Sequence, residues 1–356
     1  MAYARNKSTH TSNLNMELPI REAKWTHRMD RLFIKFSQVI GLLALPLEYS
    51  MDLLYYLINC RLSPCVARES KDSYDLIFFA HTIEKGLSLP QPRPLFGKNN
   101  IARVLNLLRK RDAGKLNPAA LKMGLGCLME YIDYHKKIGK ESDFIVSLEK
   151  EAGKLARTIP FSADGGTKDI GDIKRRLLDG TLSYPEFIES RYSCRNFLPD
   201  PVAPAEIYEV VRIAQAAPSQ CNRQSTRAYH YGDKDKIRQL LDLQGGASGF
   251  AATVPTLLVI TNDLGAWTGR NERNQCYVDG GLFSMCLLFA FHSKNIGVCA
   301  LNFAKTNSQE QIFRKAAGIP RGERVIMLIA AGHQDPSNTT AARSVRCPVE
   351  LVCRSM

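Results

Sequence analysis

Two arginines stand four residues apart in SRYSCRNF, residues 190–197, with a serine midway between them. Arg191 and Arg195 carry planar guanidinium groups, each of which can donate two parallel, charge-assisted hydrogen bonds to a phosphate or a carboxylate. Ser193 adds a hydroxyl between them. Three partners fit such a segment: an acidic side chain at a helix end, a nucleic-acid phosphate, or a cofactor phosphate. Other segments of the chain must choose among them.

A second polar segment is APSQCNRQ, residues 217–224. Taken alone, its Pro218-Ser219 pair is best interpreted as a turn that leads into a helix N-cap. A third segment, SVRCPVEL, lies near the C-terminus and contains Arg346, which alone could be a surface residue of a tail. Each segment is therefore a weak signal by itself.

The hydrophobic pattern around these segments predicts the elements that position them. Ser183-Tyr-Pro-Glu186 is a capping box with proline in the first turn, so a short helix should end near Ser190, with SRYSCRNF at its exit. Further helices are expected from Pro204, over DKDKIRQLLDL, over residues 274–295, and after an Asn307-x-x-Glu310 cap. Four apolar runs indicate strands: RAYHYG, PTLLVITND, GVCALNF and RVIMLIAAGH. This alternation predicts an α+β layered domain with a mixed or antiparallel sheet.

The order of these segments is similar to that of the FMN-dependent nitroreductase family. ESRYSCRNF resembles the family's opening Arg-x-Ser-x-Arg/Lys-x-Phe motif, and APSQCNRQ resembles its Pro-Ser-x-x-Asn-x-Gln motif. The run from YVDGGLFSMCLLFAFHSKNIGV into CALNF is similar to its central dimer helix and following strand. VIMLIAAGHQD resembles its last core strand, and SVRCPVEL its closing Ser-x-Arg-x-Pro segment. Five segments in the family's order, across about 170 residues, make this resemblance specific.

The resemblance implies a nitroreductase-like FMN-binding fold, with a mixed or antiparallel sheet flanked by helices and preceded by a helical region. It also implies a homodimer with FMN at the subunit interface. Gly280-Gly281 in the long helix costs roughly 1 kcal/mol per glycine relative to alanine. Close helix contact at a dimer interface, or a backbone near the cofactor, would explain that pair. The residues that the resemblance gives to FMN are Arg191, Tyr192, Ser193, Arg195, Pro218, Ser219, Asn222, Gln224 and Arg346.

Within that set, the resemblance gives several side chains a place on the cofactor. Arg191 and Arg346 would face the phosphate, with the Ser193 hydroxyl beside them. Arg195 would reach the N1/O2 edge of the ring, where a cation stabilises the reduced, anionic flavin. The ribityl chain and ring would be met, from the partner subunit, by Ser219, Asn222 and Gln224.

The implied activity is that of an FMN-dependent oxidoreductase. A reduced nicotinamide, NADH or NADPH, would give hydride to flavin N5, and the flavin would reduce an unidentified small-molecule acceptor in a ping-pong cycle. The chemistry resides in the flavin, so no nucleophilic side chain is required. A second hypothesis is a non-redox module of the same fold that binds a partner or a membrane surface.

Three departures from the family pattern leave the substrate open. The residues after Gln224 are Ser-Thr, where the family often has Pro-Trp. GGASGFAATVP, residues 245–255, lacks an Asn or Lys for the pyrimidine edge of the flavin. In the lid region DLGAWTGRNERNQ, Trp267 could stack on the flavin or a substrate, and Arg270 and Arg273 could bind an anionic one. A solvated loop with one anchoring aromatic residue fits that region equally well.

The first 180 residues lie outside the family core. Residues 1–24 are polar and expected to be mobile, 25–165 should form a helical extension, and 181–356 the FMN-binding domain. The apolar stretch from Trp25 to Cys60 is interrupted by charges and by Pro46, so no uncharged run reaches the roughly 20 residues of a spanning helix. It is either a pair of core or interface helices divided at Pro46, or an in-plane membrane helix.

AHTIEKGLSLP, residues 80–90, resembles the extension of nitroreductase-like proteins associated with bacterial surface-polysaccharide synthesis. Gly86 is expected to end its helix. His81 and Glu84 share a helix face and could act as a proton relay, although such a pair is more often structural. With Trp267, they are the weak candidates for catalytic side chains.

Composition sets bounds on partners and compartment. The net charge of +13 is spread over both halves of the chain and forms no stripe, so nucleic-acid binding rests on net charge alone and is disfavoured. The ten cysteines show no metal-ligand spacing, so no metal site is expected. Scattered cysteines and the lack of an apolar signal segment favour the cytoplasm, with peripheral contact at the inner face of the membrane through residues 25–60 as an addition.

Overall fold

A computed structural model of the chain describes residues 20–110, 115–159 and 163–356. Most of the N-terminal segment expected to be mobile lies outside these residues. The helices are α1 (Ile20–Asn59), α2 (Arg68–Leu87), α3 (Lys98–Leu108), α4 (Pro118–Lys137), α5 (Asp143–Thr158), α6 (Gly171–Leu178), α7 (Tyr184–Ser190), α8 (Pro204–Ala214), α9 (Lys234–Gln244), α10 (Gln275–Ser293), α11 (Asn307–Ala317) and α12 (Val349–Val352). The strands are β1 (Thr167–Asp169), β2 (Thr226–Tyr231), β3 (Thr256–Asp263), β4 (Ile296–Asn302), β5 (Glu323–His333) and β6 (Thr340–Ala342).

The central sheet has the strand order β2-β3-β5-β4, and every neighbouring pair is antiparallel. β3 is buried along nearly its whole length, as expected for an apolar run covered on both faces. Its alternate residues enter different cores: Leu257 and Val259 pack on one face, and Leu258 and Ile260 on the other. The sheet is therefore the middle layer of three.

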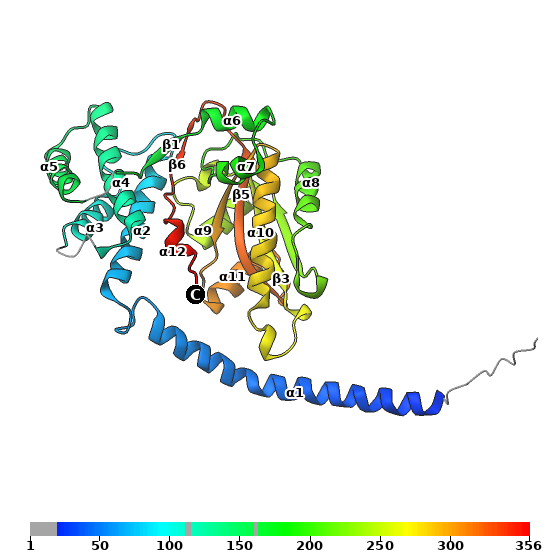
Figure 1. The fold of residues 1–356 in the computed structure, drawn as a ribbon. Helices are drawn as coiled ribbons and strands as arrows, with labels where there is room; N and C mark the ends of the chain where they lie inside the picture. The colour runs from blue at the N-terminus through cyan, green and yellow to red at the C-terminus, as the bar shows by residue number, and fades with distance from the viewer. Residues whose placement is uncertain (1–19, 111–114, 160–162) are drawn as a thin grey trace, which may run out of the picture.

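Helices cover both faces of this sheet (Figure 1). Val210 of α8 and Leu287 of α10 pack against the face that carries Leu258. Leu240 of α9 and Phe313 of α11 pack against the opposite face. The C-terminal half is thus an α+β domain with an antiparallel sheet, which confirms the predicted fold class.

Helix α10 is the apolar centre of this domain. Among the described residues, the segment Arg270–Ser293 is long and apolar enough to span a membrane by length and composition. However, 56% of its apolar window is buried inside the molecule, as in the core helix of a folded domain. A Cβ on Gly280 would lie 2.6 Å from Ile326 Cγ1 of β5, whereas Gly281 faces open space. Gly280 therefore allows a close helix–sheet contact within the chain.

Helices α2 to α5 form a second cluster with its own core, apart from the sheet (Figure 1). Each helix contributes fully or almost fully buried side chains, for example Leu76, Ile101, Leu121 and Ile145. Gly86 does not end α2, which continues to Leu87. A Cβ on Gly86 would lie 2.1 Å from Phe96 Cε2, so the glycine allows a close approach and is not a helix stop.

Helix α1 is a single helix of 40 residues that extends away from the body of the molecule (Figure 1). Pro46 lies inside it, so the expected division into two helices is wrong. Where its side chains are described, large apolar ones are exposed, such as Phe36, Leu43 and Tyr55, so they do not form a core. Pro46 has no N–H to donate, and its own carbonyl accepts a hydrogen bond of 2.7 Å from the Ser50 hydroxyl.

The segment between the two halves is structured. The residues between the expected helical extension (25–165) and the expected FMN-binding domain (181–356) contain β1, which pairs antiparallel with β6 near the C-terminus. The Arg343 N–H donates to the Gly166 carbonyl at 2.9 Å and extends this pairing. On the other side, a Cβ on Gly126 of α4 would lie 2.2 Å from the Gly165 nitrogen. The junction therefore packs tightly against both the helical cluster and the C-terminal segment.

The N-terminus of α11 differs by one residue from the predicted cap. Thr306 is the N-cap, and its N–H donates to Gln309 Oε1 at 3.0 Å. Glu310, which was expected to complete the cap, is instead buried and accepts the Val325 N–H at 3.0 Å. Its carboxylate ties α11 to β5.

Candidate functional site

A cavity of about 620 Å³ opens at the exit of α7, beside the β1–β6 pair and α10. This volume lies in the range of sites for cofactors and other small molecules. Its wall includes Lys168, Arg191, Tyr192, Ser193, Arg343, Ser344 and Arg346. The structure thus brings the first and last motifs of the sequence together in one place, which we call the cation-lined cavity. Among the described residues of its wall, Glu189 is the one acid.

The cations of this cavity are mostly unpaired. Arg343 Nη1 lies 3.1 Å from Asp164 Oδ1. Within the described residues, no hydrogen bond or ion pair engages the side chains of Lys168, Arg191 or Arg346. Burial lowers the pKa of Lys168, and the neighbouring arginines lower it further. Burial and the charge of Arg346 likewise lower the pKa of Arg191. An anion among these cations would remove their mutual repulsion.

Local structure at the end of α7 sets the position of Arg191. The capping box begins the helix, since the Ser183 N–H donates to Glu186 Oε2 at 2.8 Å. At the other end, the buried Ser190 hydroxyl lies 2.7 Å from Nε2 of His292 on α10. Arg191 then takes an extended backbone conformation as the C-cap residue. The structure therefore places SRYSCRNF at the end of this short helix, as predicted.

Sequence reasoning missed Lys168. It stands in a Gly- and Asp-rich stretch that reads as a linker, and its role depends on pairing with a strand far away in the chain. In the structure Lys168 is opposite Ala341 in the β1–β6 pair, in the wall of the cation-lined cavity. The signal that could have found it was the short Thr-Lys-Asp alternation, which is too brief to identify a strand.

Tyr192 and Arg195 take different places from Arg191. Tyr192 lines the cavity, but its hydroxyl is engaged by Gln334. Arg195 is 7% exposed and is not part of the cavity wall. Its Nη1 donates over 3.5 Å to the Ser88 hydroxyl and to the Ser193 carbonyl, and its Nε has no partner within the described residues. Arg195 is therefore a buried cation with unused donors.

His81 and Glu84 of α2, the weak candidates for a proton relay, lie near Arg195 and are not hydrogen-bonded to each other. Glu84 is fully buried, and among the described residues neither carboxylate oxygen has a hydrogen-bond partner of good geometry. Burial raises its pKa to about 7, although the backbone of Ser344 and Gly166 lowers it in part. The side chain of His81 is exposed to solvent in part. Partial burial of its ring lowers its pKa, and the charges of Arg195 and Lys85 lower it further. No hydrogen bond joins the two side chains.

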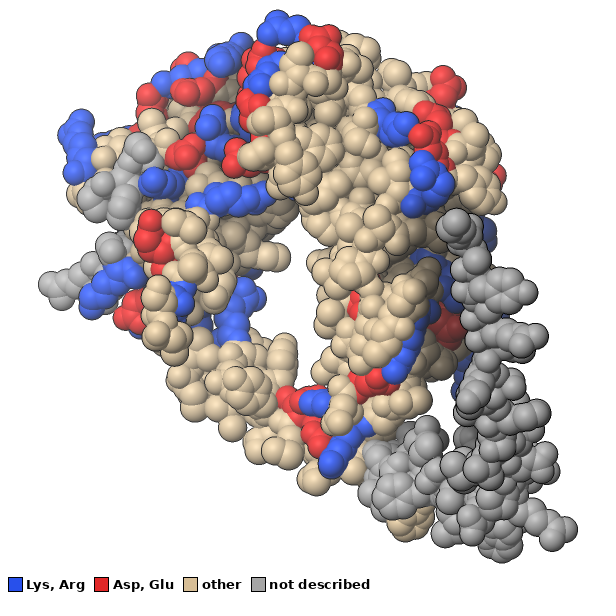
Figure 2. All heavy atoms as spheres, turned by 45° about the vertical axis from the view of Figure 1, so that its right-hand side comes forward, with Lys and Arg blue, Asp and Glu red and all other residues tan. Residues whose placement is uncertain are grey.

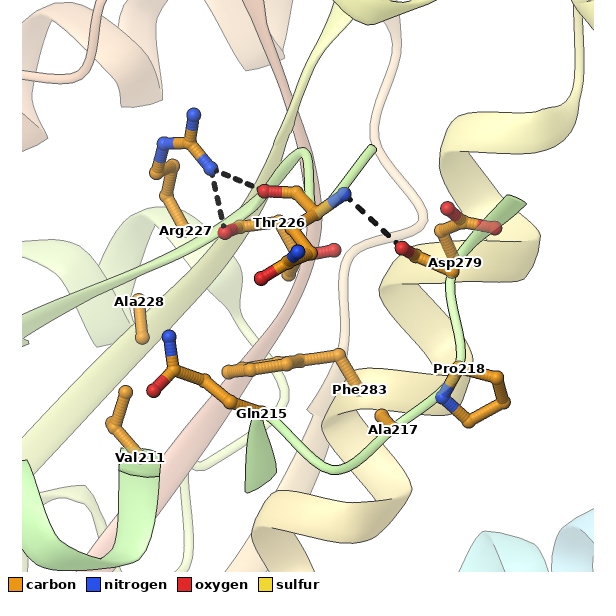
Figure 3. Close-up of a pocket in the computed structure, with 11 residues that line it drawn as sticks. Val211, Gln215, Ala217, Pro218, Thr226, Arg227, Ala228, Asp279 and Phe283 are labelled. Atoms are coloured by element: carbon orange, nitrogen blue, oxygen red, sulfur yellow. Dashed lines mark hydrogen bonds between the residues drawn. The ribbon is translucent and has the colours of Figure 1, made fainter. Parts of the chain in front are cut away.

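A second, smaller cavity of about 280 Å³ contains residues of the middle motif (Figure 3). Its wall includes Pro218, Ser219, Gln224, Asp279 and Phe283. In Figure 3, Phe283 extends from α10 across the cavity, with Val211 and Ala228 on one side and Pro218 on the other. None of these residues lines the cation-lined cavity. One chain therefore places its first and middle motifs in two separate cavities.

The loop of the middle motif is anchored to α10 on one side, and its polar side chains are exposed to solvent on the other. Asp279 of α10 is buried and accepts the Gln220 N–H at 3.0 Å, an anchor that sequence reasoning missed. Ser219 Oγ accepts the Gln224 N–H at 3.1 Å. Gln224 and Asn222 are exposed, and the Gln224 amide donates to Asn222 Oδ1 at 3.1 Å. Asn222 is not part of the cavity wall.

Backbone strain gathers at the same motifs. Six described non-glycine residues have positive φ, and four of them belong to these motif segments: Cys221 (51°), Asn222 (55°), Gln224 (48°) and Ser344 (54°). Such conformations are uncommon outside glycine and cluster at binding and active sites. The middle and last motifs therefore hold uncommon backbone conformations that the sequence does not display.

The lid region has no free arginine pair for a substrate. Arg273 makes two hydrogen bonds to Asp52 of α1, at 2.7 and 2.8 Å, and Arg270 Nη1 lies 3.6 Å from Glu48. Trp267 donates from Nε1 to Asn262 Oδ1 at 2.7 Å. The lid therefore attaches α1 to the domain, which favours the interpretation of an anchored loop.

Comparison with protein families matches the nitroreductase family over residues 188–247, which include the first and middle motifs. No curated protein matches the chain. Solved structures give distant matches. An FMN-dependent nitroreductase from Clostridium difficile R20291 is 19% identical, covering 42% of this chain and 86% of its own, with a TM-score of 0.37. A nitroreductase with bound FMN from Desulfitobacterium hafniense DCB-2 is 20% identical, covering 41% and 85%, with a TM-score of 0.34.

An NADPH:FMN oxidoreductase from Vibrio harveyi, complexed with NAD+, is 19% identical, covering 48% of this chain and 76% of its own, with a TM-score of 0.41. At such identities and TM-scores, the family match carries the assignment. The matched residues run from the end of α7 to α9 and contain the opening arginine motif and the Asp279-anchored loop. The C-terminal half of the chain is therefore a nitroreductase-family domain, preceded by a helical N-terminal region.

Proposed function

We propose that the protein is an FMN-dependent oxidoreductase that holds the FMN phosphate in the cation-lined cavity. The observation that supports this most strongly is the group of unpaired cations, Lys168, Arg191 and Arg346, in one cavity of about 620 Å³. A phosphate dianion there would accept charge-assisted hydrogen bonds and remove their repulsion. The family match at the opening arginine motif supports the choice of FMN as the source of that phosphate.

The residues present suit FMN beyond its phosphate. Arg195 is buried with an unpartnered Nε, so it has donors available for the polar edge of a ring. When bound, FMN would supply the redox chemistry, by taking hydride from NADH or NADPH and passing it to a small-molecule acceptor. The side chains named here would bind and orient the cofactor, and we assign no proton transfer to them.

A second copy of the chain would complete the site. The middle motif lies in its own cavity, away from the phosphate residues, and its polar side chains are exposed. The described part of α10 between the motifs also exposes apolar side chains, such as Tyr277, Val278 and Leu282. Packing of two such faces against each other would bring the Ser219–Gln224 loop of one copy to the cation-lined cavity of the other.

The test uses the absorption spectrum of the protein purified without added flavin, followed by FMN titration. We expect bound FMN in the native protein. Substituting Arg191→Ala and Arg346→Ala together should weaken FMN binding by at least about 100-fold, because each charged hydrogen bond contributes about 1.5–3 kcal/mol. The matched control is Arg212→Ala with Arg238→Ala, which removes equal charge from α8 and α9 and should leave binding unchanged.

Two results would contradict the proposal. One is a native protein that is colourless and takes up no added FMN. The other is a double variant at Arg191 and Arg346 that stays fully loaded, which would remove the phosphate assignment. Retention of flavin by the control variant shows that any loss comes from the cavity and not from reduced net charge.

The exposed face of α1 supports a second candidate, a module that binds a membrane surface. Phe36, Leu43, Leu47 and Tyr55 are all more than half exposed on the described part of this helix. Co-sedimentation with anionic vesicles that is lost on deletion of residues 1–59, in a protein that binds no FMN, would favour this candidate. The space-filling view shows cations and acids mixed over the visible face, with no continuous basic stripe on it (Figure 2).

A further inference from the structure

The N-terminal helical region touches the domain at the buried Arg195. Lys85 of α2 donates to the Gly246 carbonyl at 2.5 Å, and its ammonium lies 5.6 Å from the centre of the Phe250 ring. The hydroxyl of Ser88, the residue that follows the end of α2, accepts a hydrogen bond from Arg195 at 3.5 Å. Gly246 and Phe250 belong to residues 245–255, the segment that lacks an Asn or Lys for the pyrimidine edge of a flavin. The helical region thus places a lysine where that segment has none.

Lys85 has capacity to bind a ligand there. An ammonium group carries three N–H donors, and the described contacts of Lys85 use one of them for a hydrogen bond. Within the described residues, no carboxylate lies in an ion pair with Lys85 or with Arg195. Glu84, the acid next to Lys85, pairs with neither, although Arg195 lowers its pKa against the larger effect of burial.

Two cations close together, without a paired acid, repel each other. Burial lowers the pKa of Lys85, and the charge of Arg195 lowers it further. Burial lowers the pKa of His81 on the same helix, and the charges of Arg195 and Lys85 lower it further. Such a cluster is stabilised when negative charge develops beside it, as in sites that are preorganised for an anionic state of a ligand.

We propose that Lys85, carried by the helical N-terminal region, joins Arg195 in binding the electron-rich pyrimidine edge of the flavin, in place of the polar residue that segment 245–255 lacks. This inference rests on the proposed function. It makes the helical region a part of the cofactor site. Lys85 acts by charge and hydrogen bonding alone, and no covalent step is assigned to it.

The test compares Lys85→Met with Lys71→Met. Lys71 is on the same helix, and its ammonium donates to the Ser63 carbonyl at 2.5 Å, so the control loses the same kind of contact away from Arg195. The two readouts are the FMN dissociation constant and the midpoint potential of the bound flavin. We expect Lys85→Met to weaken the binding of reduced FMN about tenfold more than the binding of oxidised FMN. For a two-electron couple, this difference lowers the midpoint potential of the bound flavin by about 30 mV. Lys71→Met should leave both values unchanged.

A conservative variant separates charge from anchoring. Lys85→Gln can still donate to the Gly246 carbonyl but carries no charge, so it should show the same shift in potential even if Lys85→Met fails to fold. Lys85→Arg should restore most of the potential. If Lys85→Gln binds FMN and has the native potential, Lys85 is an anchor and the inference is wrong. If the native protein binds no FMN at all, the proposed function fails first and this inference fails with it.

Discussion

Glu84 and His292 are buried ionisable side chains that favour their neutral forms. Glu84 is fully buried, and burial raises its pKa to about 7. His292 is 4% exposed, and burial together with the charges of Arg191 and Lys168 lowers its pKa to about 4. The two groups therefore act on stability in opposite directions as the pH changes.

Glu84→Gln should stabilise the protein at alkaline pH. The folded-state pKa lies above the ordinary value of 4.5, so the favourable contribution of the neutral acid is complete below about pH 4.5 and is lost as the pH rises through about 7. Glutamine removes this titration. At pH 5 the variant should be close to the native protein, and at pH 8 its free energy of unfolding should be higher by up to about 3 kcal/mol. Urea unfolding at both pH values measures this difference.

The control for this experiment is Glu141→Gln, which changes an exposed carboxyl and should have little effect at either pH. Equal stability of Glu84→Gln and the native protein at pH 8 would show that Glu84 is not buried as described. His292 gives the opposite slope: its contribution is complete above the ordinary pKa of 6.5 and is lost as the pH falls through about 4. Because the native protein and the Glu84→Gln variant both contain His292, comparing their free energies of unfolding at the same pH cancels the contribution of His292.

Lys168→Met should weaken the binding of FMN but not of riboflavin. Lys168 lies in the wall with the phosphate candidates, so its charge would act on the phosphate that riboflavin lacks. We expect the FMN dissociation constant to rise about tenfold, the effect of one charged hydrogen bond. Fluorescence titration with both ligands measures it, with Lys294→Met, on the surface opposite Glu209, as the control. An equal loss of affinity for FMN and for riboflavin would show that Lys168 does not act on the phosphate.

At the scale of elements, α4 packs closely against the backbone of the junction at Gly126. A Cβ on Gly126 would lie 2.2 Å from the Gly165 nitrogen, a backbone atom that cannot swing aside. The same residues precede β1, so α4 packs directly against the segment that carries Lys168. In this way a helix of the N-terminal cluster supports the wall of the cation-lined cavity.

Gly126→Ala should therefore destabilise the protein, although alanine favours helices. Forcing a methyl group against fixed backbone costs about 1–3 kcal/mol. The matched change Gly153→Ala, within α5 and facing open space, should instead stabilise by up to about 1 kcal/mol. Thermal unfolding of the two variants should move in opposite directions. Similar shifts in both would show that no close contact exists at Gly126.

Local signals in the sequence predicted most of the domain's elements. The capping box before α7, the apolar face of α8 and the continuous apolar runs of β3 and β5 depend on neighbouring residues, so they can be read from the chain. The opening motif also led to the cavity residues Arg191 and Ser193. These features are determined within a few residues of sequence.

Features that depend on distant contacts could not be predicted. Gly86 has the pattern of a helix end, but the Phe96 ring beside it determines its role. Pro46 has the pattern of a helix break, yet α1 passes through it. Lys168 needs β6, which follows it by more than 170 residues. The burial of Arg195 beside Ser88 is of the same kind, since no local pattern places residue 88 against residue 195.

For the whole molecule, the separation of the motifs into two cavities supports our proposal that a second copy completes the site. Leu282→Glu would place a charge on the exposed apolar face of α10, which we propose as the contact between copies. The variant should become monomeric, as measured by light scattering on a sizing column. It should also lose FMN, as measured by the flavin absorption of the same peak. The control Ile312→Glu changes an exposed apolar residue on α11, on the opposite face of the sheet, and should do neither. A monomeric variant that keeps its FMN would show that one chain suffices.

The attachment of α1 to the lid has a consequence for the size of the molecule in solution. A helix of 40 residues is about 60 Å long, and charged pairs from Glu48 and Asp52 join it to the segment around Arg273. Salt shortens the range of such pairs from about 10 Å at 0.1 M to about 3 Å at 1 M. We therefore expect the radius of gyration, measured by small-angle X-ray scattering, to increase with ionic strength. Asp52→Asn should produce the larger radius already at low salt. The ionic strength of the surrounding solution would then determine how far this helix extends from the domain.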